Sequence, residues 1–145
     1  MNGKAILLFA ALACTAGCAT NPGQRDADKL ALYSAHAGEP VDKFRYYGSI
    51  SRWTSLGDEA LAIWSRPNQA WLLDLTGPCP DLDYAHAISL TNSFGQVSAR
   101  FDKVIVLNRD AHNMPCHIAQ IRPLDVQAIK QAERAERAAA QSSGT

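Results

Sequence analysis

Short apolar runs separated by turn residues occupy the middle of the chain, and helix-forming residues lie on either side of them. Ala60–Ser65 and Ala70–Leu75 are two apolar runs with the length of strands. Arg66–Gln69, between these two runs, contains the proline and asparagine that are typical of turns. This pattern predicts a β-hairpin at the centre of the fold.

Other segments combine alternating apolar positions with aromatic or β-branched residues, which is typical of half-buried strands. Turn residues such as proline, glycine and asparagine separate these segments from one another. The sequence therefore predicts further strands at Phe44–Ile50, Ala87–Leu90, Val97–Phe101, Lys103–Leu107 and Cys116–Ile121.

Helical sequence flanks this strand-rich region. Arg25–Ala37 is rich in helix formers, and Gly38 follows where a C-terminal cap would lie. Asp125 is placed to cap a second helix over 126–140, whose narrow apolar stripe docks only its first turns. Residues 141–145 are expected to form a disordered tail.

Together these elements predict an α+β fold. We expect a compact antiparallel sheet of five to seven strands, curled towards a barrel, with flanking N- and C-terminal helices and one disulfide. Nothing in the sequence after the N-terminal segment divides the strand-rich region into two domains.

The first residues have the form of a bacterial secretory signal. Lys4 provides a positive charge, and Ala5–Ala16 is an apolar segment too short to persist as a membrane-spanning helix. Small residues then lead to Cys18, as they do at the cleavage site of lipoproteins, whose cysteine is acylated. Cys14 also follows small apolar residues, but cleavage there would truncate the apolar segment. Cys18 is therefore the predicted lipidation site.

A lipid on Cys18 would hold the protein at the cell envelope, because several acyl chains bind a membrane far more firmly than one. Position 19 is alanine, not the aspartate that retains enteric lipoproteins in the inner membrane. We therefore expect an outer-membrane anchor and a protein that faces the periplasm. The alternative interpretations are an ordinary secretory signal and a buried N-terminal helix.

These features predict four parts of the chain: a signal peptide over 1–17, a lipid-anchored tether over 18–26, a single globular domain over 27–125, and a C-terminal helix with its tail over 126–145. The 14 basic and 14 acidic side chains balance, and the signal contains one of the basic ones. A nucleic-acid-binding protein needs clustered Lys and Arg, which this balance disfavours.

Two cysteines lie in the predicted globular domain, Cys79 and Cys116. An even pair in an oxidising compartment predicts one structural disulfide. The rival interpretation is a metal site of Cys116 with His112 and His117. Pro115 would break any helix that aligned His112 with Cys116, so we expect the disulfide and assign no metal and no cofactor.

The usual catalytic signatures are absent from the sequence, including the Gly-x-Ser-x-Gly and His-Glu-x-x-His motifs. Asp81 and Asp83 place two carboxylates close together, and with His86 or His117 they would suit acid–base chemistry. The simpler interpretation is structural, with Asp81 capping a short segment over 82–85. We assign no catalytic residue and expect a protein that is not an enzyme.

Aromatic residues are concentrated in the first half of the chain. Trp64 and Trp71 lie in the two strands of the predicted hairpin, so at least one belongs in the core. Arg52 and Trp53 form a candidate binding surface, because both residue types are enriched at interface hot spots. The alternative is that Trp53 seals the edge of the sheet.

Four motifs accompany the lipoprotein signal: Ile-Trp-Ser-Arg-Pro-Asn-x-Ala-Trp-Leu-Leu, Gly-Pro-Cys-Pro-Asp-Leu, Val-Ser-Ala-Arg-Phe-Asp-Lys-Val and Cys-His-Ile-x-x-Ile-Arg-Pro-Leu-Asp. With these motifs, the region from Phe44 to Asp125 resembles a family of small uncharacterised bacterial lipoproteins, a domain of unknown function with a two-cysteine framework. The resemblance implies the envelope address and the paired cysteines, and it names no activity.

The function that we expect is that of a non-catalytic binding or accessory module, held by its lipid and in contact with another envelope protein. Two alternatives remain. One is a specific version of the binding module, a protein similar to the lipoprotein inhibitors of lysozyme, which are also compact, disulfide-stapled β-proteins. The other is a small envelope enzyme that uses Asp81, Asp83 and a histidine.

Overall fold

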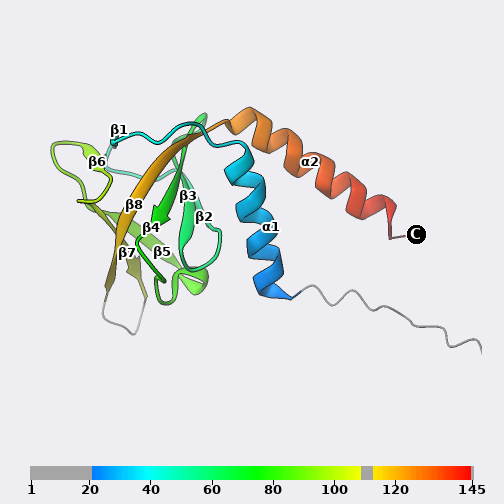
Figure 1. Ribbon diagram of the computed structural model, residues 1–145, viewed down its shortest axis with the longest axis horizontal. Helices are drawn as coiled ribbons and strands as arrows, with labels where there is room; N and C mark the ends of the chain where they lie inside the picture. Colours follow the sequence, from blue (N-terminus) through cyan, green and yellow to red (C-terminus); the bar gives the residue numbers. More distant parts are fainter. Residues whose placement is uncertain (1–20, 109–112, 145) are drawn as a thin grey trace, which may run out of the picture.

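Six antiparallel strands form a curled main sheet, and two short strands form a second sheet beside it (Figure 1). The computed structural model describes residues 21–108 and 113–144. The order across the main sheet is β2-β3-β4-β8-β7-β5, and β1 pairs with β6. The strands are β1 (Lys43–Arg45), β2 (Arg52–Ser55), β3 (Ala60–Arg66), β4 (Gln69–Leu75), β5 (Ala87–Leu90), β6 (Gln96–Ser98), β7 (Lys103–Leu107) and β8 (Met114–Leu124).

Strand β3 is buried on both faces, which explains why its sequence is a continuous apolar run. Leu61 and Ile63 point into the core enclosed by the curled sheet. Ala62 and Trp64 point to the opposite face, where the helices cover the sheet. The predicted hairpin of β3 and β4 is confirmed, with Leu61 opposite Leu73 in the antiparallel register.

Two helices flank the sheet, as the sequence predicts: α1 (Pro22–Ala35) and α2 (Val126–Ser142). The carboxylate of Asp125 accepts hydrogen bonds from the main-chain N–H groups of Gln127 and Ala128, so the predicted cap of α2 is confirmed. Only Val126 and Ile129 are buried in α2, and the rest of this helix projects beyond the sheet (Figure 1).

Helix α1 differs from the prediction at both ends. It begins at Pro22, so residues 22–26, which we expected to be a tether, are helical. It ends at Ala35 with His36 as the C-terminal cap residue, so Gly38 is not the cap. The Gly38 N–H instead donates to Pro123 O at 2.8 Å, and a Cβ on Gly38 would lie 3.1 Å from Pro123 Cγ. Close approach to β8 is therefore what requires glycine here.

The C-terminal tail also differs from the prediction. Helix α2 continues through Ser142, whereas disorder was expected from residue 141. Its exposed turns contain the i,i+4 pair Glu133 and Arg137, with 3.8 Å between Glu133 Oε2 and an Arg137 guanidinium nitrogen. Pairs of this kind support a helix that has little else to pack against.

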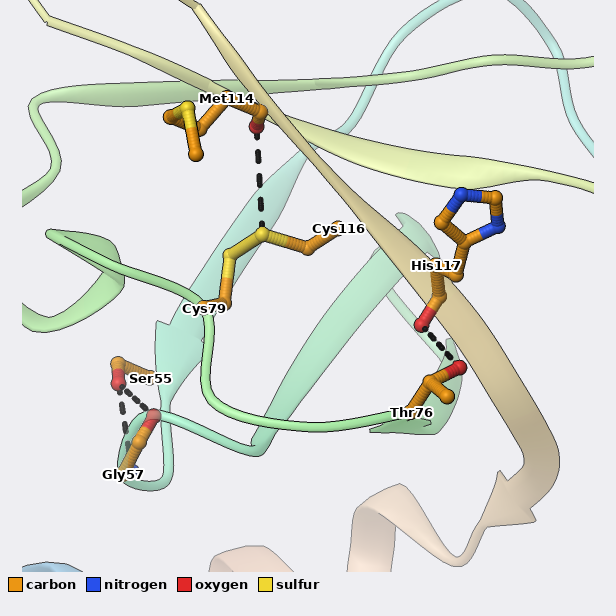
Figure 2. Close-up of a disulfide and its surroundings, with 7 residues drawn as sticks. All are labelled: Ser55, Gly57, Thr76, Cys79, Met114, Cys116 and His117. Atoms are coloured by element: carbon orange, nitrogen blue, oxygen red, sulfur yellow. Dashed lines mark hydrogen bonds between the residues drawn. A yellow bond between two sulfur atoms is a disulfide. The ribbon is translucent and has the colours of Figure 1, made fainter.

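The disulfide joins Cys79, between β4 and β5, to Cys116 in β8 (Figure 2). The Cα atoms of the two residues are 5.7 Å apart, and Cys79 is fully buried. The predicted disulfide, and with it the α+β fold of a curled sheet and two helices, is confirmed.

Two predicted strands are shorter than their apolar alternation indicates. The segment Phe44–Ile50 is a strand only to Arg45, because Gly48 adopts a φ of 81° that turns the chain. Val97–Phe101 is a strand only to Ser98, because Arg100 adopts a φ of 69°. Both positive φ values are incompatible with extended backbone, so the strands stop before them.

A tight turn between β5 and β6 holds Phe94 in an unfavourable conformation. Ser93 and Gln96 exchange two main-chain hydrogen bonds, and both central residues of the turn have positive φ, 52° at Phe94 and 72° at Gly95. Asparagine and glycine favour this type I′ turn, and bulky side chains do not. The Phe94 side chain is 105% exposed and gains nothing from burial.

We therefore expect Phe94→Asn to raise the free energy of unfolding by about 1 kcal/mol, the cost of the left-handed conformation for an ordinary residue. Urea denaturation of the two proteins measures the difference. Phe101→Asn is the matched control, since Phe101 is 79% exposed and is not among the residues of positive φ. An equal gain in both variants would contradict the assignment of strain to residue 94.

Candidate functional site

A groove runs along β2, the strand at one edge of the main sheet. Three adjoining cavities make up this groove, and residues of β2 link them. Trp53 and Thr54 line the first and the third cavity, and Arg52 lines the second and the third. Their volumes are about 550, 260 and 250 Å³. We call these three cavities the β2 groove. Helix α1 lies next to β2, and the first turns of α2 lie above it (Figure 1).

The middle of the β2 groove is lined by residues of both helices and of the sheet. Tyr33 on α1 donates its hydroxyl to Glu133 on α2, with 2.8 Å between the oxygens. Lys29 and Arg52 line the same cavity. The α1–α2 hydrogen bond therefore closes one wall of a cavity that holds two cations and one carboxylate.

The guanidinium of Arg52 lies over the ring of Trp64, 3.8 Å from its centroid. This cation–π contact holds the guanidinium over the indole, and the ion pairs of the described residues do not include its N–H groups. Lys130 on α2 lines the same cavity, together with Ser51 and Pro67. No carboxylate lines this end of the groove.

The cations of the β2 groove lack carboxylate partners within the described part of the chain. The ion pairs found there are Arg100–Asp42, Arg122–Asp74 and Arg137–Glu133, and none of them includes Lys29, Arg52 or Lys130. Beneath Arg52, the Nε1 of Trp64 is buried without a hydrogen-bond partner. The groove thus offers donors in excess of acceptors.

The opposite end of the groove holds two carboxylates and one cation. Asp26 of α1 and Asp83 of the short 3₁₀ helix η1 (Leu82–Tyr84) line the largest cavity, beside the start of α1, and Lys29 lines it too. Ser55 donates its hydroxyl to the carboxylate of Asp83, which fixes η1 against β2. Tyr84 is 84% exposed at this end. The charge along the groove therefore changes from negative near η1 to positive near Lys130.

Burial and the neighbouring Glu133 carboxylate raise the pKa of Tyr33, because both disfavour the phenolate. The folded protein therefore keeps a proton that the unfolded chain releases near pH 10, so stability is full below that pH and falls as the pH rises above it. The loss is about 1.4 kcal/mol per pH unit for one such group.

We expect the free energy of unfolding of the wild type to fall more steeply between pH 9.5 and 11 than that of Tyr33→Phe. Urea denaturation at several pH values measures both slopes. Because Tyr46 also has a pKa raised by burial, the difference between the two proteins, not the wild-type slope alone, isolates Tyr33. Equal slopes would contradict the shift.

A family model matches residues 1–140, and its description is "Family of unknown function (DUF6491)". The chain belongs to the DUF6491 family. No curated protein and no solved structure matches the chain. The family therefore shows a shared domain and leaves its biochemical role to be argued from the site.

The candidate surface predicted from sequence, Arg52 and Trp53, lies in the β2 groove of this DUF6491 chain. Arg52 is exposed, whereas Trp53 is half-buried and packs against the enclosed core. Trp53 thus seals the edge of the sheet, as in the alternative interpretation, and presents only part of its ring to the groove. Trp64, at 2% exposed, is the tryptophan that belongs to the core.

The structure does not gather the residues of the predicted acid–base site in the groove. Asp83 lines the largest cavity, but Asp81, His86 and His117 do not. His86 and His117 are exposed, and the His117 imidazole points away from the disulfide (Figure 2). Among the residues that the structure describes, no three His, Cys, Asp or Glu side chains are arranged to hold a metal ion.

The predicted capping role of Asp81 is wrong. Asp81 precedes η1, but its side chain makes no capping hydrogen bond. Its φ of 63° is left-handed, whereas a capping residue has extended backbone. Asp81 therefore serves the turn through its backbone conformation, which aspartate tolerates better than most residues.

Other predicted site residues cannot be placed. Cys18, its alternative Cys14 and the histidine at position 112 lie outside the described residues. Neither helix in the described segments has the length and hydrophobicity of a membrane span. Cys18 as the lipidation site therefore stays a prediction from the sequence.

Sequence reasoning missed the helical side of the groove, which consists of Lys29, Tyr33, Lys130 and Glu133. Lys29, Lys130 and Glu133 are polar positions on two helices that are far apart in sequence. The only sequence signal was that Tyr33 shares the apolar stripe of α1, where a hydroxyl needs a partner when it is buried.

Proposed function

We propose that this protein is a lipid-anchored, non-catalytic binding module of the bacterial cell envelope, held at the outer membrane and facing the periplasm, and that the β2 groove receives its partner. The observation that carries the binding role is the groove itself. It combines an unpaired sheet edge with cations that have no carboxylate partner among the described residues.

A rigid site favours binding, because a partner then meets a surface that is already ordered. Arg52 is held by Trp64, Tyr33 by Glu133 and η1 by Ser55, so three contacts fix the groove from different elements. The disulfide pins the loop that carries η1 to β8.

The envelope address is supported by the lipoprotein form of the signal at Cys18 and by the disulfide, which is typical of oxidising compartments. The covalent distance is also short. Pro22 begins α1 and lines the largest cavity, so Cys18 lies only a few residues from one end of the groove.

The anchor is tested by the mass of the N-terminal peptide of protein purified from its own cells. We expect a chain that begins at Cys18 and carries diacylglyceryl and acyl increments. Cys18→Ala should leave the precursor uncleaved and unmodified. An unmodified N-terminus at another position of the wild-type protein would contradict the anchor.

The binding role is tested by photo-crosslinking in intact cells. Tyr84→p-benzoylphenylalanine places a photoreactive aromatic group in the groove, and the same replacement at Phe94 is a matched control on another exposed aromatic residue. We expect a protein adduct from position 84 that position 94 does not give. Adducts from position 94 alone would contradict the groove as the binding surface.

A further inference from the structure

We infer that the β2 groove takes its partner as an added β-strand: an extended, acidic segment of another envelope protein pairs with the outer edge of β2. This inference rests on the proposed binding role and names the chemistry of the partner. Strand addition uses main-chain hydrogen bonds for affinity and side-chain pockets for specificity, and both are present here.

The outer main-chain edge of β2 pairs with no strand of the described residues, and its Ser55 C=O accepts a hydrogen bond from the Thr54 hydroxyl at 3.4 Å. Leu56 N–H donates to Ala60 O at 2.9 Å, so Leu56 and Ala60 form a hydrogen-bonded pair. Such pairs alternate with non-hydrogen-bonded pairs along the two antiparallel strands. Arg52 and Thr54 then face β3 with their N–H and C=O groups, whereas Trp53 and Ser55 direct theirs away from the sheet. Because β2 ends the strand order, no strand of the described residues lies on that side.

The largest cavity lies where an added strand would run. It is lined by Trp53, Thr54 and Ser55 on the sheet side and by the start of α1 opposite. Trp53 and Ser55, the residues whose main-chain groups point outward, therefore both line a cavity of about 550 Å³. Cavities that follow a strand edge one after another suit an extended chain better than a compact ligand.

The charge of the helical face selects an acidic segment. In the register, Thr54 lies opposite Ala62 and Arg52 opposite Trp64, so both side chains lie on the face that the helices cover. Alternate side chains of an added strand would point to the same face. There they would meet Lys29, Arg52 and Lys130, the cations without carboxylate partners.

The carboxylate that lines the middle cavity is already engaged, because Glu133 accepts from Tyr33 and pairs with Arg137. Glu133 therefore competes little with the carboxylates of a ligand for the cations of the groove. We expect acidic residues at alternate positions of the bound segment, since carboxylates at that spacing would face these cations in succession. Near η1, where Asp26 and Asp83 lie, the segment should carry no acidic residue.

The experiment maps the segment that crosslinks to p-benzoylphenylalanine at position 84, using mass spectrometry of the adduct from intact cells. The expected segment belongs to another protein and carries acidic residues two positions apart. A segment without that pattern, a second copy of this chain, or an adduct of lipid would each overturn the inference.

Two variants test the two parts of the inference. Arg52→Gln with Lys130→Gln removes the charge, and we expect about a tenfold loss of adduct, as the loss of one strong charge-assisted contact would produce. Lys43→Gln with Arg134→Gln is the matched control, because both of these exposed residues lie outside the groove. An equal loss in both double variants would overturn the role of charge.

Ser55→Pro removes an outward N–H, which an edge strand tolerates, and should abolish the adduct. Ser55→Ala also removes the hydroxyl that holds η1 through Asp83, but it keeps the N–H, so it should give more adduct than Ser55→Pro and the difference isolates the main-chain hydrogen bond. Circular dichroism confirms that each variant is folded. Should Ser55→Pro fail to fold, the charge variants still decide the outcome.

The two levels of the proposal fail differently. If position 84 gives no protein adduct in the wild type, the proposed binding role itself fails. If position 84 gives an adduct that neither the charge variants nor Ser55→Pro reduces, a partner binds at the groove but not as an added acidic strand.

Discussion

Replacing both Cys79 and Cys116 with alanine is expected to lower the free energy of unfolding by about 4 kcal/mol. The two cysteines are 37 positions apart, and the crosslink restricts the unfolded chain over that loop. The effect is large because it approaches half of the stability of a typical small domain. Cys79 is also fully buried in the enclosed core, so the loss of packed sulfur adds to the entropic term.

Urea denaturation of the double variant and of the wild type, with and without reducing agent, measures this effect. The free energy of unfolding of the reduced wild type should approach that of the double variant, since both lack the crosslink. Any remaining difference comes from the sulfur atoms, which only the wild type keeps. If the wild type is equally stable in both redox states, the disulfide contributes nothing and the prediction fails. Cys79→Ala alone is not a suitable control, because it leaves a reactive thiol at Cys116.

Asp102→Ala is expected to destabilise the protein by about 3 kcal/mol, the loss of two hydrogen bonds to a charged group. Asp102 is 6% exposed, and its carboxylate accepts from the Thr91 hydroxyl and from Ser98 N–H, both at 2.7 Å. Thr91 in turn accepts from Lys103 N–H at 2.9 Å. One carboxylate thereby joins the ends of β5 and β6 to the start of β7.

Graded variants distinguish this network from simple packing. Asp102→Asn keeps the shape but offers one acceptor oxygen, so its loss should fall between those of wild type and Asp102→Ala. Thr91→Val should cost about 2 kcal/mol, because it removes one hydrogen bond to the Asp102 carboxylate and one neutral hydrogen bond from Lys103 N–H. Equal losses for Asp102→Asn and Asp102→Ala would show that both carboxylate oxygens are needed together, and negligible losses for both would refute the network.

The role of Asp102 was not visible in the sequence. Spacing along the sequence would pair Arg100 with Asp102 and Arg122 with Asp125. The structure instead pairs Arg100 with Asp42 and Arg122 with Asp74. Each of these pairs joins residues that only the fold brings together, so spacing along the chain could not reveal them.

Local signals predicted the centre of the fold well. The β3–β4 hairpin has turn residues between two apolar runs, and the cap of α2 by Asp125 depends only on neighbouring residues. The disulfide was predicted from the two cysteines that follow a segment with the form of a secretory signal. For the hairpin and the cap, the physical cause lies within the segment itself.

Backbone conformation and distant contacts account for what the sequence did not predict. Positive φ values at Gly48, Arg100 and Asp81 ended strands or replaced a cap. The second sheet pairs Phe44 with Val97, and the β2 groove needs α1 and α2 to meet over a sheet edge. Of the groove, the sequence indicated only Arg52, Trp53 and Asp83.

The position of β8 in the sheet has a consequence for biosynthesis. This late strand lies between β4 and β7, so a nascent chain that lacks it has two neighbouring strands with nothing to join them. The long sequence separation between β4 and β8 makes their pairing the slow, entropically costly step of folding. Until β8 arrives, the exposed edges of β4 and β7 are open to pairing with other unfinished chains, so this strand order makes aggregation a risk during synthesis.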